Sequence, residues 1–308
     1  MKVEPGFFCS ARSRAIEENI YGTASMGQVW LLLEHPQPWG LRPLRDTKLS
    51  DAVKQHLHET LTTIPRSRLL LMKQRAPKND FISFYVAVTR ERRPGLYQFA
   101  LETYADLLEL NLPRLVAGQS DFGVVQRTQP LFLVCADGKH DKCCAKYGLP
   151  IYAALKSCVG EAAWQSSHVG GDRFAGNLVC FPHGVFYGRV DRADVEPLVY
   201  DYLDGRLRLE NYRGRACYSF EVQAADYFAR AESGITGLDE LFLTQQSRAG
   251  EHVWQIQFQS SDGRIHQVTI RAFRSQFSNY LRCQALQEEH VNQYELLSYE
   301  VTESASVV

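Results

Sequence analysis

The chain has 308 residues, of which 45% are hydrophobic and 22% are charged, as in an ordinary globular protein. Its formal net charge of -1 gives no overall attraction to nucleic acid or to a membrane surface, so we expect neither as a partner. No apolar run approaches the roughly 20 residues of a membrane-spanning helix, and the first residues lack the apolar segment of a secretory signal. The eight cysteines do not resemble a disulfide framework. These features predict a cytoplasmic protein whose clustered cysteines are ligands or reactive thiols.

The first third of the chain is predicted to alternate strands and helices. Short apolar runs that end at proline or glycine are typical of buried strands, and apolar residues recurring every four positions are typical of a helix. In chain order the expected elements are a strand at 27–35, a helix at 48–63, strands at 66–73, 82–89 and 95–101, and a helix at 103–116.

The middle of the chain repeats part of this order. The expected elements are a strand at 130–135, a helix at 143–158, a strand at 162–167, a hairpin formed by 177–182 and 184–190, and a helix at 191–204. This β-α-β-β-α order matches the thioredoxin-like fold, because a right-handed crossover places the first two strands parallel with the hairpin beside them. The first third is a candidate for a degenerate copy of the same unit.

The last third has a different pattern. A helix is expected at 217–232, followed by strands at 240–244, 253–260, 264–272 and 292–301, with a hairpin turn at 260–263. We expect a small antiparallel sheet packed on the middle unit. The predicted class is α/β (α+β), in three parts: an N-terminal α/β domain at 1–125, a thioredoxin-like domain with the ligand loops at 126–212, and a C-terminal helix and sheet at 213–308.

Metal-binding side chains gather in two loops of the middle unit. Cys135 ends a predicted strand, Cys144 begins the following helix, and His168 follows the next strand. Since the loops after two parallel strands lie at the same edge of a sheet, these three side chains can converge. Gly170 and Gly171 allow the backbone to approach closely, as a loop wrapped over a cluster requires. Thiolate sulfur together with imidazole nitrogen suits zinc, copper or an iron–sulfur cluster, not magnesium or calcium.

The same segment carries three longer motifs. They are Cys135-x8-Cys144 with Cys143 beside it, His168-x-Gly-Gly-Asp172-Arg-Phe-Ala, and Pro182-His-Gly-x-x-Tyr-Gly-Arg189. Together with Gly22-Thr-Ala24, Leu32-Leu-Glu-His-Pro36, Trp39-Gly40 and Tyr212-Arg-Gly-Arg215, they resemble the sucrase/ferredoxin-like family along the whole chain. That family comprises thioredoxin-like [2Fe-2S] proteins, including the fungal actin-patches-distal ferredoxins.

The resemblance implies a ligand set. It implies Cys135 and Cys144 as the two thiolate ligands of one iron, and His168 as the first of two histidines that hold the other iron in a fungal His-x-Gly-Gly-His segment. This chain departs from that pattern because Asp172 stands at the second histidine position. The fourth ligand is therefore either Asp172 or Cys283, and we favour Cys283 because sulfur is the softer donor.

Other residues near these motifs are expected to support the ligands or to have structural roles. We expect Gly170, Gly171, Arg173 and His140 to support the ligands rather than to bind metal. Cys143 points about 100° away from Cys144 on a helix and is expected to be structural. Cys158 and Cys180 are expected in the core, His183 in a solvated turn, and Cys9 and Cys217 carry no signal.

We predict a one-electron carrier with a [2Fe-2S] cluster held by cysteine and histidine, because imidazole in place of thiolate raises the reduction potential. Two alternatives remain open: a metal-free thiol oxidoreductase that uses Cys143 and Cys144, and a structural zinc module with Cys135, Cys144, His168 and Cys283. No motif of another enzyme class is present, so whether the chain is itself an enzyme stays open, and no sucrase activity is expected.

Basic side chains surround the predicted site in the sequence. They are Lys139, Lys142, Lys146, Arg173 and Arg189. Such a run is either a solvated face or a surface that docks an acidic redox partner protein, whose identity the sequence does not give.

Overall fold

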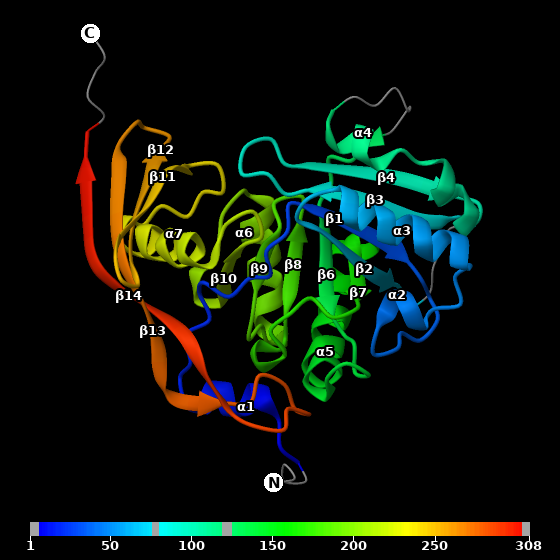
Figure 1. Cartoon of the computed structure of the whole chain (residues 1–308), viewed down its shortest axis with the longest axis horizontal. Coiled ribbons are helices and arrows are strands. Elements are labelled where there is room, and N and C mark those ends of the chain that lie inside the picture. Colours follow the sequence, from blue (N-terminus) through cyan, green and yellow to red (C-terminus); the bar gives the residue numbers. More distant parts are fainter. Residues whose placement is uncertain (1–5, 76–79, 119–124, 304–308) are drawn as a thin grey trace.

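A ten-stranded mixed sheet forms the centre of the molecule (Figure 1). The computed structural model describes residues 6–75, 80–118 and 125–303. The order across the sheet is β10-β9-β8-β6-β7-β2-β1-β3-β4-β5. In chain order these strands are β1 (Val29–Glu34), β2 (Ser67–Lys73), β3 (Ile82–Val88), β4 (Gly95–Leu101), β5 (Val125–Gln126), β6 (Leu131–Cys135), β7 (Ala163–Ser166), β8 (Leu178–Phe181), β9 (Val185–Tyr187) and β10 (Tyr212–Arg215).

The sheet contains two units with the same connectivity. In the first, β1 is parallel to β2 and antiparallel to β3, which pairs with β4. In the second, β6 is parallel to β7 and antiparallel to β8, which pairs with β9. The helices α3 (Asp51–Thr63) and α5 (Lys142–Val159) form the two crossovers. This arrangement confirms the predicted thioredoxin-like order and its recurrence in the first third.

The two units join edge to edge through β2 and β7. These strands pair antiparallel, with Met72 opposite Ser166 and Lys73 opposite Gln165. Alternate side chains of a strand point to opposite faces of the sheet. Leu31 on β1 therefore packs with the α3 side, and Phe132 on β6 packs with the α5 side. The opposite faces of both units, with Cys135 among them, share one continuous core.

Two predicted helices are shorter or divided in the structure. The expected helix at 103–116 is a 3-10 turn, η1 (Tyr104–Glu109), followed by α4 (Leu112–Val116). Pro113 cannot donate to a preceding turn, so it lies in the first turn of a new helix, which Asn111 caps. The expected helix at 191–204 is η4 (Arg192–Asp194) followed by α6 (Val195–Leu203).

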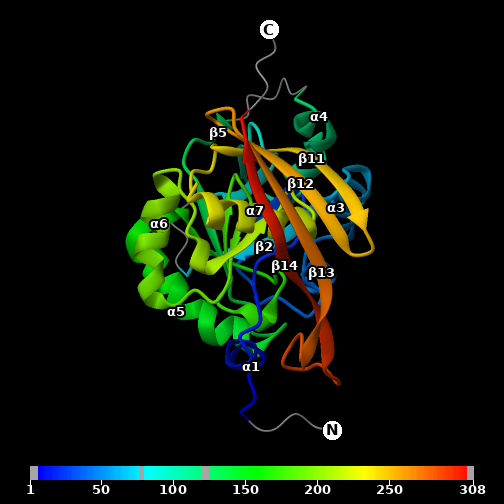
Figure 2. The same ribbon diagram turned by 90° about the vertical axis from the view of Figure 1, so that its left-hand side faces the viewer.

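The last part of the chain is a helix, α7 (Phe220–Ser233), and an antiparallel sheet, as predicted. The sheet packs on α7 and not directly on the middle unit, where it was expected. Its strands are β11 (Leu241–Gly250), β12 (Val253–Ser260), β13 (Ile265–Asn279) and β14 (Glu289–Thr302). The turn at 260–263 is confirmed by the hydrogen bond from Gly263 N–H to Ser260 O. The helix α7 contacts both β10 and β13. The β13–β14 hairpin is longer than predicted and extends to α1 (Cys9–Ala15) (Figures 1 and 2).

Short elements complete the described chain. They are α2 (Pro43–Asp46), η2 (Gly160–Ala162), η3 (Asp172–Phe174) and η5 (Leu209–Asn211). Within the residues described above, no helix combines the length and the apolar character that crossing a membrane requires. The boundaries proposed at 125/126 and 212/213 stay predictions.

Candidate metal centre

The structure brings Cys135, Cys144 and His168 together. One ligand atom of each lies within 4.8 Å of the corresponding atom of the other two. Cys135 is the last residue of β6, Cys144 is in the first turn of α5, and His168 follows β7 by two residues. Because β6 and β7 are parallel and Cys135 pairs with Ser166, their ends open at the same edge of the sheet. Both sulfurs are buried, and the histidine side chain is 25% exposed.

Local sequence explains the close approach of α5 to the end of β6. Asp141 caps the helix by accepting a hydrogen bond from Cys143 N–H at 2.8 Å. One turn further, a side chain at Gly148 would collide with the carbonyl oxygen of Cys135. Glycine at this position therefore lets the helix approach the strand end, and the approach sets the separation of Cys135 and Cys144.

Asp172 and His140 complete the surroundings of His168. An Asp172 carboxylate oxygen accepts a hydrogen bond from the Cys144 thiol at 3.1 Å, and the same oxygen lies 2.9 Å from His168 Nδ1. The other carboxylate oxygen lies 3.5 Å from His140 Nε2. The rings of His140 and His168 stack with their centroids 3.7 Å apart. His140, expected only to support the site, is therefore part of a second donor group with His168 and Asp172.

Electrostatics favour a charged site in the metal-free chain. The hydrogen bond from Cys144 is the largest cause that lowers the pKa of Cys135, to about 6, against the opposing effect of burial. Burial alone lowers the pKa of His168, but Asp172 and Cys135 outweigh it and raise that pKa to about 10. Burial raises the pKa of Asp172, yet His140 and His168 outweigh it and hold that pKa far below its usual value. At neutral pH a thiolate, an imidazolium and a carboxylate therefore lie side by side.

The donor set fits a soft or borderline metal. His168 Nδ1 lies 2.9 Å from an Asp172 oxygen, so a metal bound at this nitrogen would replace the proton that the carboxylate now faces. Two sulfurs and two imidazoles match the donors of zinc or of an iron–sulfur cluster. These residues therefore fit the cofactor that the sequence predicts.

The structure places Cys283 in a different group. The Cys283 sulfur lies 3.2 Å from the sulfur of Cys143 and 3.6 Å from that of Cys9. Cys143 and Cys144 are neighbours, but successive residues point about 100° apart on a helix, so they face two separate groups. This placement gives no support to our preference for Cys283 over Asp172, because Asp172 is the residue beside Cys144 and His168.

The loop after His168 is held by a buried arginine that the sequence analysis did not single out. Arg213 on β10 donates to Gly170 O at 3.0 Å and to Asn177 Oδ1 at 2.8 Å. Gly171 has φ +82°, in the left-handed region, and a side chain there would collide with the Arg213 guanidinium. The available signal was the motif at 212–215, which carries this arginine.

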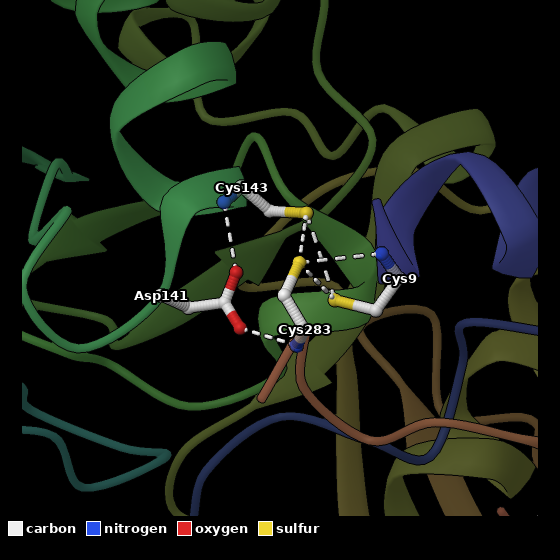
Figure 3. Close-up of side chains that lie close together, drawn as sticks. All are labelled: Cys9, Asp141, Cys143 and Cys283. Atoms are coloured by element: carbon white, nitrogen blue, oxygen red, sulfur yellow. Dashed lines mark hydrogen bonds between the residues drawn. The ribbon is translucent and has the colours of Figure 1, made fainter. Parts of the chain in front are cut away.

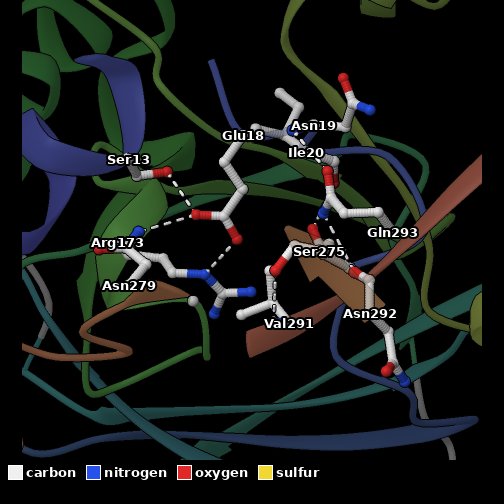
Figure 4. Close-up of polar contacts among 12 residues, drawn as sticks. Ser13, Glu18, Asn19, Ile20, Arg173, Ser275, Asn279, Val291, Asn292 and Gln293 are labelled. Atoms are coloured by element: carbon white, nitrogen blue, oxygen red, sulfur yellow. Dashed lines mark hydrogen bonds and ion pairs between the residues drawn. The ribbon is translucent and has the colours of Figure 1, made fainter. Parts of the chain in front are cut away.

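Arg173 turns away from the candidate metal centre. Its guanidinium lies 2.6 Å from the fully buried Glu18, which also accepts hydrogen bonds from Ser13 and Asn279 (Figure 4). Arg173 was expected to support the ligands, and its ion-pair partner is instead Glu18. Arg173 thus fastens the η3 segment to the N-terminal residues and to β13.

Three minor predictions have mixed outcomes. Cys180 is buried, as expected. Cys158 is exposed because the buried stripe of α5 continues from Ile151 and Leu155 to Val159, which leaves Cys158 beside it. His183 is not a solvated turn residue, since its Nδ1 lies 2.7 Å from the buried Tyr202 hydroxyl.

Two cavities meet at the histidine pair. The larger, about 1050 Å³, has five cationic side chains in its wall, and the smaller, about 730 Å³, lies between His168 and the loop at 281–289. The cations are Arg42, Arg45, Lys54, Arg66 and Arg68. The His140 and His168 side chains are 21% and 25% exposed, so their edges connect the buried sulfurs with solvent.

Comparison with known proteins agrees with this geometry. No curated protein and no solved structure shows significant similarity to the chain. One family description, sucrase/ferredoxin-like, matches residues 20–214. The match covers both β-α-β-β units and all residues of the candidate metal centre, whereas Cys9 and Cys283 lie outside it. Because it spans more than half of the sequence, the chain belongs to the sucrase/ferredoxin-like family.

Proposed function

We propose that the chain is an electron-transfer protein with a [2Fe-2S] cluster held by Cys135, Cys144 and His168. The observation that carries this proposal is the convergence of these three donors at one edge of the sheet. Bound there, the cluster would supply one-electron chemistry. The chain's own contribution is to hold the ligands, shield the sulfurs from water and set the charge around them.

We propose His140 as the fourth ligand. It lies beside His168, and imidazole is a softer donor than the carboxylate of Asp172. Asp172 contacts both histidines and the Cys144 thiol, which suits a carboxylate that orients ligating imidazoles. In this arrangement His140 takes the part of the second histidine that the fungal sequences place at the position of Asp172.

The exposed histidine edges suit electron exchange with a partner protein. The sulfurs are buried, so the imidazoles are the shortest connection between the site and solvent. The cations that line the larger cavity favour an acidic redox partner over nucleic acid or a membrane. The cytoplasm is the proposed location, because cysteines that bind metal are typical of a reducing compartment.

The thiol alternative has less support. Cys143 and Cys144, the two thiols that this alternative uses, are both fully buried. A thiolate that a substrate cannot reach is poorly placed for disulfide exchange.

Purification without oxygen tests the proposal. We expect a brown protein with about two irons and two sulfides per chain, and an electron paramagnetic resonance signal on reduction. Cys135→Ser should lose the iron, whereas Cys158→Ser, which changes an exposed cysteine, should keep it. A colourless wild-type protein that binds only zinc, or no metal, would contradict the proposal.

A further inference from the structure

The structure contains a second group of cysteines, formed by segments far apart in the sequence. Cys9 comes from α1, Cys143 from the first turn of α5, and Cys283 from the loop between β13 and β14 (Figure 3). Their three sulfur–sulfur distances are 3.2, 3.6 and 3.6 Å. All three residues are buried, and none forms a disulfide. Asp141 also belongs to this group, with a carboxylate oxygen within 4.8 Å of every sulfur.

We propose that Cys9, Cys143 and Cys283 bind a single zinc-class cation in a closed site, with Asp141 as the fourth donor. The site fastens α1 and the β13–β14 loop to the start of α5. It is independent of the proposed function, because its donors are distinct from those of the candidate metal centre.

Two of the three sulfurs accept hydrogen bonds from groups outside the cysteine side chains. The backbone N–H of Cys9 donates to the Cys283 sulfur at 3.4 Å, and the Ser10 hydroxyl donates to the Cys143 sulfur at 3.3 Å. Cys143 also lies at the N-terminus of an 18-residue helix, where the helix dipole stabilises negative charge. Donors aimed at sulfur are typical of the hydrogen bonds that support ligating thiolates.

The sulfur spacing favours one cation over a cluster. A zinc–sulfur bond of about 2.3 Å places the thiolates of a tetrahedral site roughly 3.8 Å apart. The observed distances are roughly 0.2 to 0.6 Å shorter than this, so an outward movement of that size would admit the ion. Each iron of a [2Fe-2S] cluster takes two terminal ligands, so a third thiolate binds the other iron and lies farther from the first two than three sulfurs in mutual contact do.

Asp141 is placed to complete the coordination. Its two oxygens accept hydrogen bonds from the backbone N–H groups of Cys143 and Cys283, at 2.8 and 2.6 Å. Each carboxylate oxygen has a second lone pair, so these bonds leave capacity for a metal. The ammonium groups of Lys142 and Lys146 lie 4.8 and 3.6 Å from the centre of the Phe8 ring, next to Cys9. Their charge offsets part of the negative charge of three thiolates and a carboxylate.

The segments that this site would join, α1 and the β13–β14 loop, are short or far apart in the sequence. The helix α1 has only seven residues and no side-chain cap at its N-terminus, so it is unstable by itself. Cys9 and Cys143 are 134 residues apart, and Cys143 and Cys283 are 140 apart. Because the site does not exist in the unfolded chain, the free energy of metal binding stabilises this arrangement. The loop that carries Cys283 also lines the smaller cavity beside His168, so the second site holds one wall of the candidate metal centre.

Metal analysis of the full chain and its variants tests this proposal. After anaerobic purification with zinc in the medium, we expect one zinc per chain in addition to any iron. Cys9→Ser and Cys283→Ser should lose the zinc and keep the iron, and Cys135→Ser should show the opposite pattern. Cys217→Ser, a partly buried cysteine outside both groups, should keep both metals. The opposite patterns separate a failure of this proposal from a failure of the proposed electron-transfer function.

Spectroscopy keeps the proposal testable if a variant folds poorly. Zinc X-ray absorption of the wild-type chain should show three sulfur neighbours at about 2.3 Å and one oxygen. Removing zinc with a chelator should increase hydrogen exchange in α1 and in the loop at 280–288. The proposal is overturned if the wild-type chain binds no zinc, if Cys217→Ser loses zinc as fully as Cys283→Ser, or if Cys143 and Cys283 form a disulfide in the protein purified without oxygen.

Discussion

Two neighbouring cysteines at the start of α5 belong to two different kinds of site. Cys144 faces Cys135 and His168, and all three residues lie between positions 135 and 168. Their site has a partly exposed imidazole edge. Cys143 faces Cys9 and Cys283, which come from the two ends of the chain and form a closed group of sulfurs. Structural metal sites are typically closed, whereas functional sites keep an open side. Under our two proposals, Cys144 therefore binds the redox cluster and Cys143 binds a structural cation.

The largest expected effect separates the two cysteines directly. Cys144→Ser should reduce bound iron to below about a tenth of the wild-type amount, because serine is a poor ligand of iron–sulfur clusters. Cys143→Ser should retain iron and lose zinc. The measurement is iron and zinc per chain by mass spectrometry of the purified proteins. Retention of iron in Cys144→Ser together with its loss in Cys143→Ser would exchange the roles of the two residues.

Adding one methyl group to the loop after His168, in the candidate metal centre, should lower the stability of the chain. Gly171→Ala adds a side chain that collides with the buried Arg213, at a left-handed backbone position, and should cost roughly 2–4 kcal/mol in stability. Gly205→Ala is the matched control: its φ is +73° and no atom lies near the added carbon, so it should cost about 1 kcal/mol.

Urea unfolding of both glycine variants and the wild-type chain, all measured without metal, provides the comparison. Equal losses of unfolding free energy in the two variants would mean that contact with Arg213 does not stabilise the loop. Cluster content of Gly171→Ala should also fall, since the loop positions His168.

Replacing the His168 imidazole of the candidate metal centre should change the reduction potential of the bound cluster. His168→Cys should keep a cluster and lower the reduction potential by an amount on the order of 100 mV, because a thiolate adds negative charge. The wild-type potential should also depend on pH, whereas that of the variant should depend on it less. Redox titration at several pH values measures both effects, and an unchanged potential in a fully loaded variant would remove His168 from the ligand set.

The smallest effect is a thiol titration in the metal-free chain. Cys135 has a pKa of about 6, below its ordinary 9.0. Its thiolate therefore contributes stability that is present above pH 9 and is lost as pH falls through about 6. His168→Gln should move this titration upward by about one unit, because the imidazolium no longer stabilises the thiolate. Thiolate absorbance against pH follows the change, Cys135→Ser should abolish the transition, and an unmoved midpoint would contradict the contact.

The sequence predicted the convergence of Cys135, Cys144 and His168 because it depends on local features. Cys135, Cys144 and His168 each follow or begin a predictable element, and the parallel crossover fixes which edge they share. His140 was recognised only as a neighbour, since its stacking on His168 depends on the shape of the loop. The motif at 212–215 contains Arg213, but its contact with the loop after His168 was not predicted, because that contact depends on how β10 adds to the sheet.

The closed site could not be predicted from the sequence. Cys9 and Cys283 have no pattern around them, and their meeting depends on α1 docking beside a hairpin that extends further than its apolar alternation indicates. The same reason applies to the pairing of β2 with β7, which joins the two units through strand edges that carry no local signal. The choice of Cys283 as a cluster ligand rested on donor softness alone and had no information about position.

Pulsed electron paramagnetic resonance of the reduced, anaerobically purified chain tests the central claim most directly. The account predicts strong hyperfine coupling from histidine nitrogen at a [2Fe-2S] centre, reduced in His168→Cys and in His140→Ala and retained in Asp172→Asn. Cys283→Ser should leave the spectrum unchanged. A reduced cluster without nitrogen coupling, or one whose signal disappears in Cys283→Ser and survives in His168→Ala, would contradict mixed ligation at the edge of β6 and β7.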